Sequence, residues 1–398
     1  MADKAFQISF DGAAADQALY HSAVELMVEE STAAAGRFHL KLNTVLHEDG
    51  NWTYLDDDRL ALFTRITIKV GFTGGDGHAG DKAVLEPVFD GYVTAVNLNL
   101  GSEPGNTFIE VSGMDPSVLM SLEEKTVAWP GLSDSDIAQQ IVGAYGLPIQ
   151  ADSTPTVHEP ADTTIVQRGS DIQFVRDLAA RNGFEFYFET DRDSGQTSAY
   201  FRAPRLQDTT QSDLAIQFHG LSNLHGFTAR LTGQRPLNVK VSQMDVGSND
   251  EQTAQVDHTG LTKLGATDAQ ALVGTPLARL VKPREAPAQM LVLGPPTSNA
   301  TELHTVAQAV RDDAAWVIMA NGEINNEAYQ AVLRPRRLVL VKGAGKQYSG
   351  RYYVTRVVHQ LRADGSYTQT FEARRNARDL DGTERFAESG RGLALVGQ

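Results

Sequence analysis

The chain has 398 residues with 41% hydrophobic, 21% charged and 8% aromatic side chains, and its formal charge is −15. At roughly 100–200 residues per domain, this length predicts about two to four domains, and the composition is that of a folded protein rather than a disordered or fibrous one. The acidic balance argues against a general phosphate-binding surface, because nucleic-acid affinity comes largely from clustered Lys and Arg. We therefore expect no nucleic-acid binding.

The sequence contains no cysteine, which excludes disulfides, thiolate nucleophiles and Cys-ligated metal sites. Residues 1–10 lack a basic segment followed by a long apolar run, and no stretch approaches the ~18–20 apolar residues that span a bilayer. We expect a protein that is soluble in the cytoplasm where it is made, with no stable membrane insertion.

Short runs of alternating apolar and polar residues dominate the first third of the chain. The runs at 38–42 and 66–70 have the period of two that is typical of strands with one buried face. Stretches rich in Gly, Asp, Asn and Pro follow at 55–58, 71–81 and 101–106 and supply turn conformations. The pattern predicts antiparallel β structure.

Two helices are predicted in the middle of the chain. The first begins at the N-cap residue Ser133 and stops at Gly146. The second begins at Ser170, where Gln173 three residues on is typical of a capping box, and it ends at 182–183, an Asn-Gly pair.

Strands resume after the second helix. Phe alternates with Glu and Tyr over 184–189, and further strand-like runs lie at 214–218, 227–231 and 237–241. The polar stretch at 247–262 has little periodicity, and we interpret it as an exposed loop or a domain junction.

A third helix, the longest, is predicted to begin at Asn299 with Glu302 as its start signal. Its apolar residues keep helical spacing as far as Ile318, and the Asn-Gly pair at 321–322 is expected to end it. A last β block follows over 337–374.

One strand pattern, Tyr-Val-Thr-x-Val, occurs at 92–96 and again at 353–357. Each copy is preceded by a strand and a Gly-rich turn and is followed, across a turn, by a strand that opens with Thr-Phe. This shared order predicts a duplicated β unit. The alternative is that alternating strands resemble one another by chance.

Few segments match a motif for a cofactor or metal site. Residues 75–80 match Gly-x-Gly-x-x-Gly, but an extended segment with Pro87 follows instead of a helix, so a hairpin loop is favoured over a dinucleotide site. The acidic groups at 56–58 and at Asp191 and Asp193 complete no EF-hand and are interpreted as solvated turns.

The ten histidines form no metal-binding motif. We therefore name no catalytic, cofactor-binding or metal-binding residue and expect no enzyme and no cofactor. A site assembled from distant residues stays open.

Three segments read together resemble a known family. They are 89–115 with the helix to 147, which opens with Phe-Asp-Gly-Tyr-Val-Thr; 167–188, with a capped helix, a Gly and an aromatic strand; and 349–375, a closing hairpin. Their order and spacing resemble the phage late-control D family of tail hub proteins and the hub portion of VgrG-type spike proteins.

The resemblance implies a mainly β fold with α insertions, in which two related β-barrel hub domains carry helix-containing insert domains. It implies a homotrimer at the centre of the baseplate of a contractile phage tail or injection system, where a sixfold inner tube meets a threefold spike. The implied partners are an inner tube protein, baseplate wedge proteins and effector cargo. The protein would be made in the cytoplasm of a bacterium or phage-infected cell and incorporated into the particle.

The sequence ends soon after the closing hairpin, so the puncturing spike tip is expected to be a separate polypeptide. The domain boundaries expected from the pattern are 1–115 with 210–246 for the first barrel, 116–209 for an α+β insert, 247–335 for a connecting region with the long helix, 336–377 with part of 247–335 for the second barrel, and 378–398 for a loose C-terminal tail.

Two alternatives remain. One is a glycan-binding or hydrolytic tail-associated β-barrel protein, motivated by the aromatic residues Trp52, Tyr54 and Trp129. The other keeps the hub and gives residues 247–262 a role in docking cargo.

Overall fold

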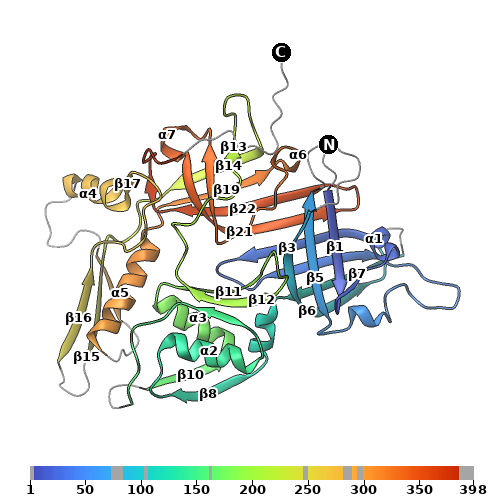
Figure 1. Ribbon diagram of the computed structural model, residues 1–398, viewed down its shortest axis with the longest axis horizontal. Coiled ribbons are helices and arrows are strands. Elements are labelled where there is room, and N and C mark those ends of the chain that lie inside the picture. The colour runs from blue at the N-terminus through green and yellow to red at the C-terminus, as the bar shows by residue number, and fades with distance from the viewer. Residues whose placement is uncertain are drawn as a thin grey trace.

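The computed structural model describes residues 4–72, 84–102, 106–160, 164–244, 250–280, 289–293 and 299–384. The fold is mainly β with helical insertions, as the sequence predicts. A 13-stranded sheet forms the two β-rich parts at the top and right of Figure 1, and smaller sheets with helices lie below and to the left.

The N-terminal part forms the first unit. It contains the elements β1 (Lys4–Phe10), β2 (Ala13–Ala14), α1 (Gln17–Ser22), β3 (Ala23–Ser31), β4 (Arg37–Asn43), the 3-10 turn η1 (Asp58–Leu60), β5 (Arg65–Phe72), β6 (Val84–Asn99) and β7 (Phe108–Met114). The predicted alternation is confirmed, because Phe38, Leu40 and Leu42 on β4 are all buried in one core.

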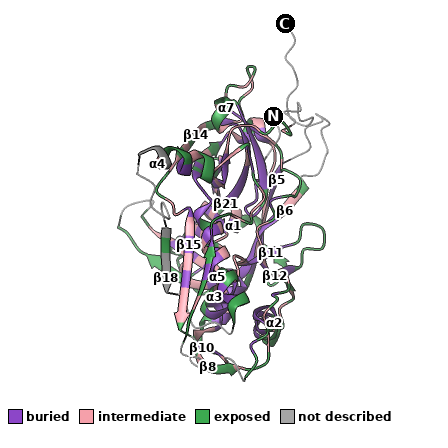
Figure 2. Ribbon diagram, turned by 90° about the vertical axis from the view of Figure 1, so that its left-hand side faces the viewer, coloured by how far each residue is buried: buried purple, intermediate pink, exposed green. Residues whose placement is uncertain are grey.

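The C-terminal part forms the second unit. It contains β13 (Leu214–Ala215), β14 (Leu224–Leu231), β17 (Thr267–Asp268), the π-helical turn η3 (Gln270–Gly274), α4 (Thr275–Leu280), β19 (Ile318–Ile324), α6 (Asn326–Tyr329), β20 (Leu338–Lys342), α7 (Gly345–Tyr348), β21 (Gly350–Arg362), β22 (Tyr367–Arg375) and β23 (Ala377–Arg378). Its own core includes Val317, Ile318, Tyr352 and Phe371. Figure 2 shows buried residues concentrated on the strands of both units.

The two units share one strand order. In the first, the order across the sheet is β3-β4-β7-β6-β5, and in the second it is β14-β19-β22-β21-β20. Each unit therefore uses five strands in the same succession, and every neighbouring pair is antiparallel. Strand β3 of the first unit also pairs antiparallel with β21 of the second, which joins the units within one sheet.

The Tyr-Val-Thr-x-Val pattern marks the same β-bulge in both units. Thr94 and Thr355 are the extra residues where the β6–β7 and β21–β22 ladders shift register. The Thr94 hydroxyl donates to the carbonyl oxygen of Ser112 at 3.3 Å, and the Thr355 hydroxyl donates to that of Glu372 at 3.2 Å. Bulges are specific features that re-aim a strand, so the pattern has one structural role used twice.

A second shared feature lies just before β5 and β20. Phe63 and Arg336 both have left-handed backbones, with φ of 65° and 63°, which is uncommon for residues other than Gly. Their backbone N–H groups donate to the carbonyl oxygens of Val93 at 2.8 Å and Val354 at 2.7 Å. Chance similarity of alternating strands does not account for this shared path, so the duplication is structural.

The insert lies between the units in sequence and below them in Figure 1. It contains the 3-10 helix η2 (Pro116–Ser121), β8 (Glu124–Trp129), α2 (Asp134–Ala144), β9 (Ile149–Ala151), β10 (Ile165–Ser170), α3 (Asp171–Arg181), β11 (Glu185–Thr190) and β12 (Thr197–Arg202). The helix α2 is confirmed with a complete capping box at Ser133. The capping box predicted at Ser170 is wrong: Ser170 is the last residue of the β10 ladder, and its side chain makes no cap hydrogen bond.

A small sheet consists of β15 (Asn238–Met244), β16 (Glu251–Val256) and β18 (Gln289–Leu293), with helix α5 (Ala300–Ala314) against it. The interpretation of 247–262 as a loop is therefore wrong at 251–256, whereas 257–262 form no helix or strand. Ala254 and Val256 on β16 are buried with Leu303 and Ala307 of α5, and this burial makes an otherwise polar segment a strand.

The predicted long helix ends earlier than its periodicity indicates. Helix α5 stops at Ala314, and the Asn-Gly pair at 321–322 lies within strand β19. Strand β19 is paired on both sides, with β14 and β22. These ladder hydrogen bonds and the burial of Ile318 outweigh a local helical pattern.

The predicted grouping of 210–246 with the first barrel is also wrong. Strand β13 pairs with β20, and β14 pairs with β19, so both belong to the second unit. Strands far apart in sequence are paired here, and local patterns carry no information about such pairing.

Several predictions lie outside the described residues, namely the Gly-rich segment 75–80 and the last part of the tail, 385–398. The start of the predicted loose tail is ordered, because β23 pairs with β17 and Arg351 contacts Asp381 at 2.7 Å. In the described part of the chain, no helix is long and apolar enough to cross a membrane.

Candidate functional site

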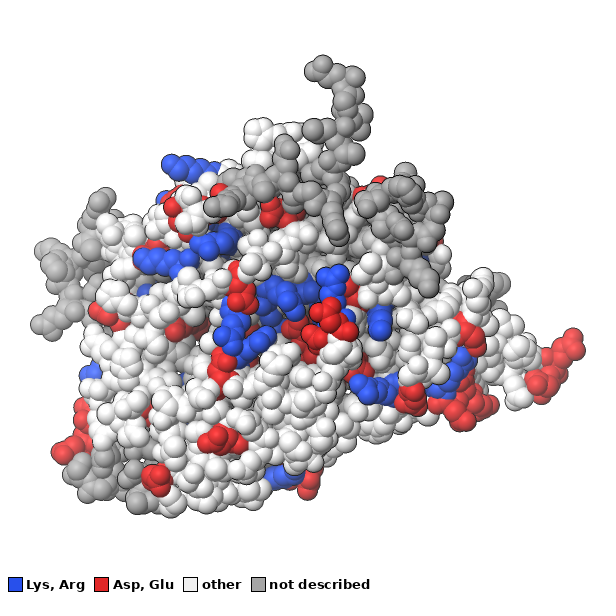
Figure 3. All heavy atoms as spheres, in the orientation of Figure 1, with Lys and Arg blue, Asp and Glu red and all other residues white. Residues whose placement is uncertain are grey.

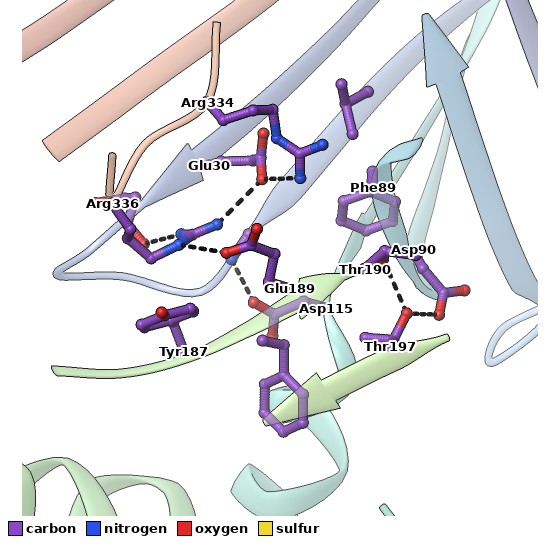
Figure 4. A pocket seen from close by; sticks show the side chains of 14 residues that line it. Glu30, Phe89, Asp90, Asp115, Tyr187, Glu189, Thr190, Thr197, Arg334 and Arg336 are labelled. Carbon is purple, nitrogen blue, oxygen red and sulfur yellow. Dashed lines mark hydrogen bonds and ion pairs between the residues drawn. The ribbon is translucent and has the colours of Figure 1, made fainter. Parts of the chain in front are cut away.

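A cluster of buried charged side chains lies where the two units and the insert meet. We call it the charged junction, and it consists of Glu30, Glu189, Arg334 and Arg336 (Figure 4). Glu30 comes from β3 of the first unit, Glu189 from β11 of the insert, and the two arginines from the segment before β20 of the second unit. Each of the four residues is less than a tenth exposed.

Glu30 connects the first unit to the second. Its Oε1 atom accepts from Nη2 of Arg334 at 3.0 Å and from Nη2 of Arg336 at 3.2 Å. Burial by itself would raise the pKa of Glu30, but Arg334, the neighbouring His359 and Arg336 outweigh it and lower the pKa to about 2. The carboxylate is therefore ionised at neutral pH, as its two cationic partners require.

Arg336 connects all three parts. Its Nη1 donates to the carbonyl oxygen of Ser31 at 3.1 Å, its Nε faces Oε2 of Glu189 at 3.4 Å, and its guanidinium lies 4.3 Å from the ring centroid of Tyr187. Burial would raise the pKa of Glu189, but the nearby arginines, Arg336 foremost, lower it. Figure 4 shows the two carboxylates pointing toward the guanidinium of Arg336.

The insert strand β11 has two buried faces. Phe186 and Phe188 pack into the core of the insert, whereas Glu185 on the other face accepts from the Tyr353 hydroxyl at 2.6 Å and from Arg374 at 2.9 Å. Sequence reasoning had found only the alternation. The signal available was a strand whose Glu residues flank aromatic ones, and it did not show that the acidic face would be buried.

The first copy of the repeat also contacts the insert. Asp90, two residues before the first Tyr-Val-Thr, forms an ion pair with Arg65 at 2.7 Å and accepts from the hydroxyl of Thr197 on β12. The insert is thus fixed to the first unit through Asp90 and to the second through Glu185 and Glu189.

The junction is suited to holding domains rather than to binding a ligand. The space among its side chains is about 20 Å³, which is room for about one water molecule. Within the described ranges, no three His, Asp or Glu residues are grouped as a metal site would require. Buried ion pairs of this kind fix geometry, because breaking one leaves an unpaired buried charge.

A groove beside the junction carries charges of both signs. Arg192, Arg202 and Arg337 line it together with Glu86 and Asp191. Figure 3 shows Lys and Arg gathered next to Asp and Glu near the middle of this face. The mixed charges form no continuous basic surface there.

The other residues named from the sequence take no part in the ion pairs of the junction. Tyr54 is buried and shares a hydrogen bond with Ser22 at 3.0 Å. The Trp129 indole N–H donates to Gln167 at 3.2 Å. These contacts favour packing roles over an exposed aromatic platform. The acidic groups hold turns: Asp57 caps η1, and Asp191 accepts from the backbone of the turn that follows it.

Two of the strand edges that lack a partner within the described residues belong to equivalent parts of the repeat. Strand β14 pairs with β19 alone, and β6 pairs with β7 alone from Ala95 onward. Apolar side chains along and directly after this part of β6 are exposed: Val96 by 39%, Leu98 by 41% and Leu100, one residue beyond the strand, by 52%. Native proteins usually cover or blunt such edges.

Comparison with known families gives one assignment. The model of the Alg8 N-terminal domain family matches residues 5–363. The chain belongs to the Alg8 N-terminal domain family. The sequence resemblance had pointed to the late-control D family by name, and the matching family model is a different one.

Solved structures show the fold of this Alg8 N-terminal domain protein. The 43 kDa tail protein of prophage MuSo2 from Shewanella oneidensis is 13% identical, with a TM-score of 0.60, 95% of this chain covered and 100% of that one. A tail protein from Neisseria meningitidis is 10% identical, with a TM-score of 0.61 and coverage of 94% and 97%.

A third similar structure is an E. coli component of the type VI secretion system that is itself structurally similar to the T4 tail proteins gp27 and gp5. It is 13% identical, with a TM-score of 0.54 and coverage of 98% of this chain and 80% of that one. No curated protein matches the sequence. At these identities the likeness shows a shared fold, which is the fold of phage-tail and secretion-system proteins.

Proposed function

We propose that this protein is a structural baseplate hub subunit of a contractile tail or injection system, and not an enzyme. Three copies form a ring in which each contributes two units, so that six similar units face a sixfold inner tube while the ring keeps threefold symmetry for a spike. The domain division remains part of this proposal, with β13 and β14 (214–231) grouped with the second unit and β15 (238–244) with the small sheet.

The observation that carries the proposal is the duplication itself. Two units in one chain share strand order, bulge position and left-handed residue. A closed ring repeats one interface around its axis, and a duplicated subunit lets three chains present nearly sixfold surfaces. The fold shared with tail and secretion-system proteins adds support.

The proposed partners follow from this role. They are a second and third copy of the chain, an inner tube protein, baseplate wedge proteins, a separate spike-tip protein and effector cargo. The protein would assemble in the cytoplasm before incorporation into a particle.

Native mass spectrometry of the purified chain tests the proposal. We expect a trimer that binds the tube protein encoded beside it. A monomer at micromolar concentration that binds neither tube nor spike would overturn the hub assignment. Turnover of a glycan substrate by the same preparation would favour the tail-associated hydrolase instead.

Deleting residues 247–262 would not test the cargo-docking alternative. That segment contains β16, whose Ala254 and Val256 are buried against α5. Its deletion would remove a strand from the small sheet, so lost cargo would not distinguish docking from misfolding. Surface substitutions such as Gln255→Lys, at an exposed position of β16, separate the two.

A further inference from the structure

The joint between the two units shows how one unit covers its neighbour. Strand β3 pairs antiparallel with the second half of β21, from Arg356 to Arg362. On this covered strand, Val357 and His359 are fully buried, and Leu361 is 6% exposed. Among the described residues, no strand covers the equivalent half of β6 in the first unit in this way.

The two β6-type strands can be aligned residue by residue from Tyr92 and Tyr353. The aligned pairs place three exposed apolar residues at buried positions of β21: Val96 at Val357 and Leu98 at His359 on the second half of β6, and Leu100, directly after β6, at Leu361. These residues are 39–52% exposed on the first unit and at most 6% exposed on the second. We call the β3–β21 pairing the closed joint, and the unpaired edges of β14 and of the second half of β6 the open joint.

The covering strand has an equivalent as well. Strands β3 and β14 each carry a bulge at the same place, after Ala23 and after Leu224. Counting from the bulge, Leu26, Val28 and Glu30 of β3 correspond to Phe227, Ala229 and Leu231 of β14. Beyond β19, β14 pairs with no other strand in the described residues, so its free edge is the equivalent of the one that β3 uses.

We infer that β14 of one copy pairs antiparallel with the second half of β6 of another copy, in the register of the β3–β21 joint. That register places three apolar pairs face to face: Leu100 with Phe227, Leu98 with Ala229, and Val96 with Leu231. The inference rests on the proposed trimer and names the strands that join its subunits.

The charges of the two joints support this pairing. In the joint within the chain, Glu30 contacts Arg336 at 3.2 Å. The corresponding residues of the open joint are Leu231 and Phe63, and Phe63 is 48% exposed. Both members of the ion pair are replaced by apolar residues, so closing the open joint leaves no unpaired charge at this position.

The occupant is a second copy and not the same chain. Figures 1 and 2 both show β14 and β6 well apart, in different units. The contact is therefore head to tail, and head-to-tail contacts either close into rings or grow into filaments. Three copies that alternate the two joints would close a ring of six units without a free edge.

Engineered cysteines test the register directly, because the chain has none of its own. The double variant Asn99→Cys/Thr228→Cys places one cysteine on each open edge, at positions equivalent to the paired residues Gln360 and Met27. Under mild oxidation we expect covalent dimers and trimers on non-reducing gels. Gln360→Cys/Met27→Cys is the positive control and should give a disulfide within one chain.

The matched negative control is Asn99→Cys/Arg230→Cys, which shifts one cysteine by two residues, about 6–7 Å along the strand. That distance exceeds disulfide reach. Equal cross-linking in both double variants, or none while the positive control closes, would overturn the inference. If the wild-type chain is trimeric in either case, the proposed function stands without this joint; if it is monomeric, both fail.

A charge substitution gives an independent measurement. Leu98→Asp buries a carboxylate in the joint and should raise the concentration at which trimers dissociate by about tenfold or more. Asn97→Asp, on the opposite face of the same strand and facing Arg230 in the inferred register, should leave it unchanged. An unaltered trimer for Leu98→Asp, with a folded circular-dichroism spectrum, contradicts the inference.

Discussion

The two joints of the repeat use opposite chemistry. The joint inside the chain buries Glu30 and Arg336, whereas the corresponding positions on the open edges are the apolar Leu231 and Phe63. A buried charge without its partner costs several kcal/mol, but an exposed Leu or Phe costs little. Charged residues thus lie where their partner belongs to the same chain and is always present. Apolar residues lie on the edges that are exposed to solvent before assembly.

Arg336→Met is the substitution with the largest expected effect on the charged junction. The substitution keeps an unbranched, flexible apolar stem at this left-handed position, but it removes the guanidinium and leaves Glu30 and Glu189 with fewer cationic partners. We expect a loss of about 3–5 kcal/mol in the free energy of unfolding, measured by chemical denaturation.

Arg337→Ala is the matched control for this loss. Arg337 also contacts Glu189, but its side chain is 52% exposed, so its ion pair should contribute at most about 1 kcal/mol. Equal losses for the two variants would show that burial does not distinguish these arginines and would contradict the role given to the junction.

Two leucines at equivalent positions sharpen the comparison. Leu361 is 6% exposed in the closed joint, and Leu100 is 52% exposed on the open edge. Leu361→Ala should lower the unfolding free energy by about 2–5 kcal/mol through the cavity it leaves, while Leu100→Ala should change it by about 0.5 kcal/mol or less. Leu100→Ala should instead weaken trimerisation, and a large loss of monomer stability would contradict its exposed position.

The pH dependence of stability tests the ionised state of Glu30. Its folded-state pKa of about 2 lies below the ordinary value of 4.5, so its contribution is present above pH 4.5 and is lost as the pH falls toward 2. This contribution is roughly 3 kcal/mol. Glu30→Gln should be less stable at neutral pH and show a flatter acid limb in denaturation between these two pH values; parallel profiles for the two proteins would contradict this.

Local patterns predicted the strands, the helix α2 and the repeated unit, because hydrophobic periodicity and helix caps depend on residues that are close in sequence. They failed where pairing decides the structure. The helical spacing extends to Ile318 and the predicted helix to 321–322, but these residues are paired on both sides as part of β19. Residues 251–256 look like a loop, but they form β16 and are covered by α5.

The charged junction was missed for a related reason. Glu30 and Arg336 are 306 positions apart, and alternation assigns Glu189 to a solvent face. Two signals were present: the Glu-Glu pair at 29–30 that ends an apolar strand, and three arginines within 334–337. Neither shows that these segments meet, because that depends on the β3–β21 pairing.

The smallest expected effects lie in the bulges that the units share. Thr94→Ala and Thr355→Ala each remove one hydroxyl that donates to a strand carbonyl, at 3.3 and 3.2 Å. Each should lower the unfolding free energy of the monomer by about 0.5–1.5 kcal/mol, by similar amounts at the two sites, and Thr→Ser at either site should retain most of it. A loss of unfolding free energy for Thr355→Ala alone would contradict a shared role for the two hydroxyls. The pattern would then stabilise the pairing of β21 with β3 and would not be a feature of both units.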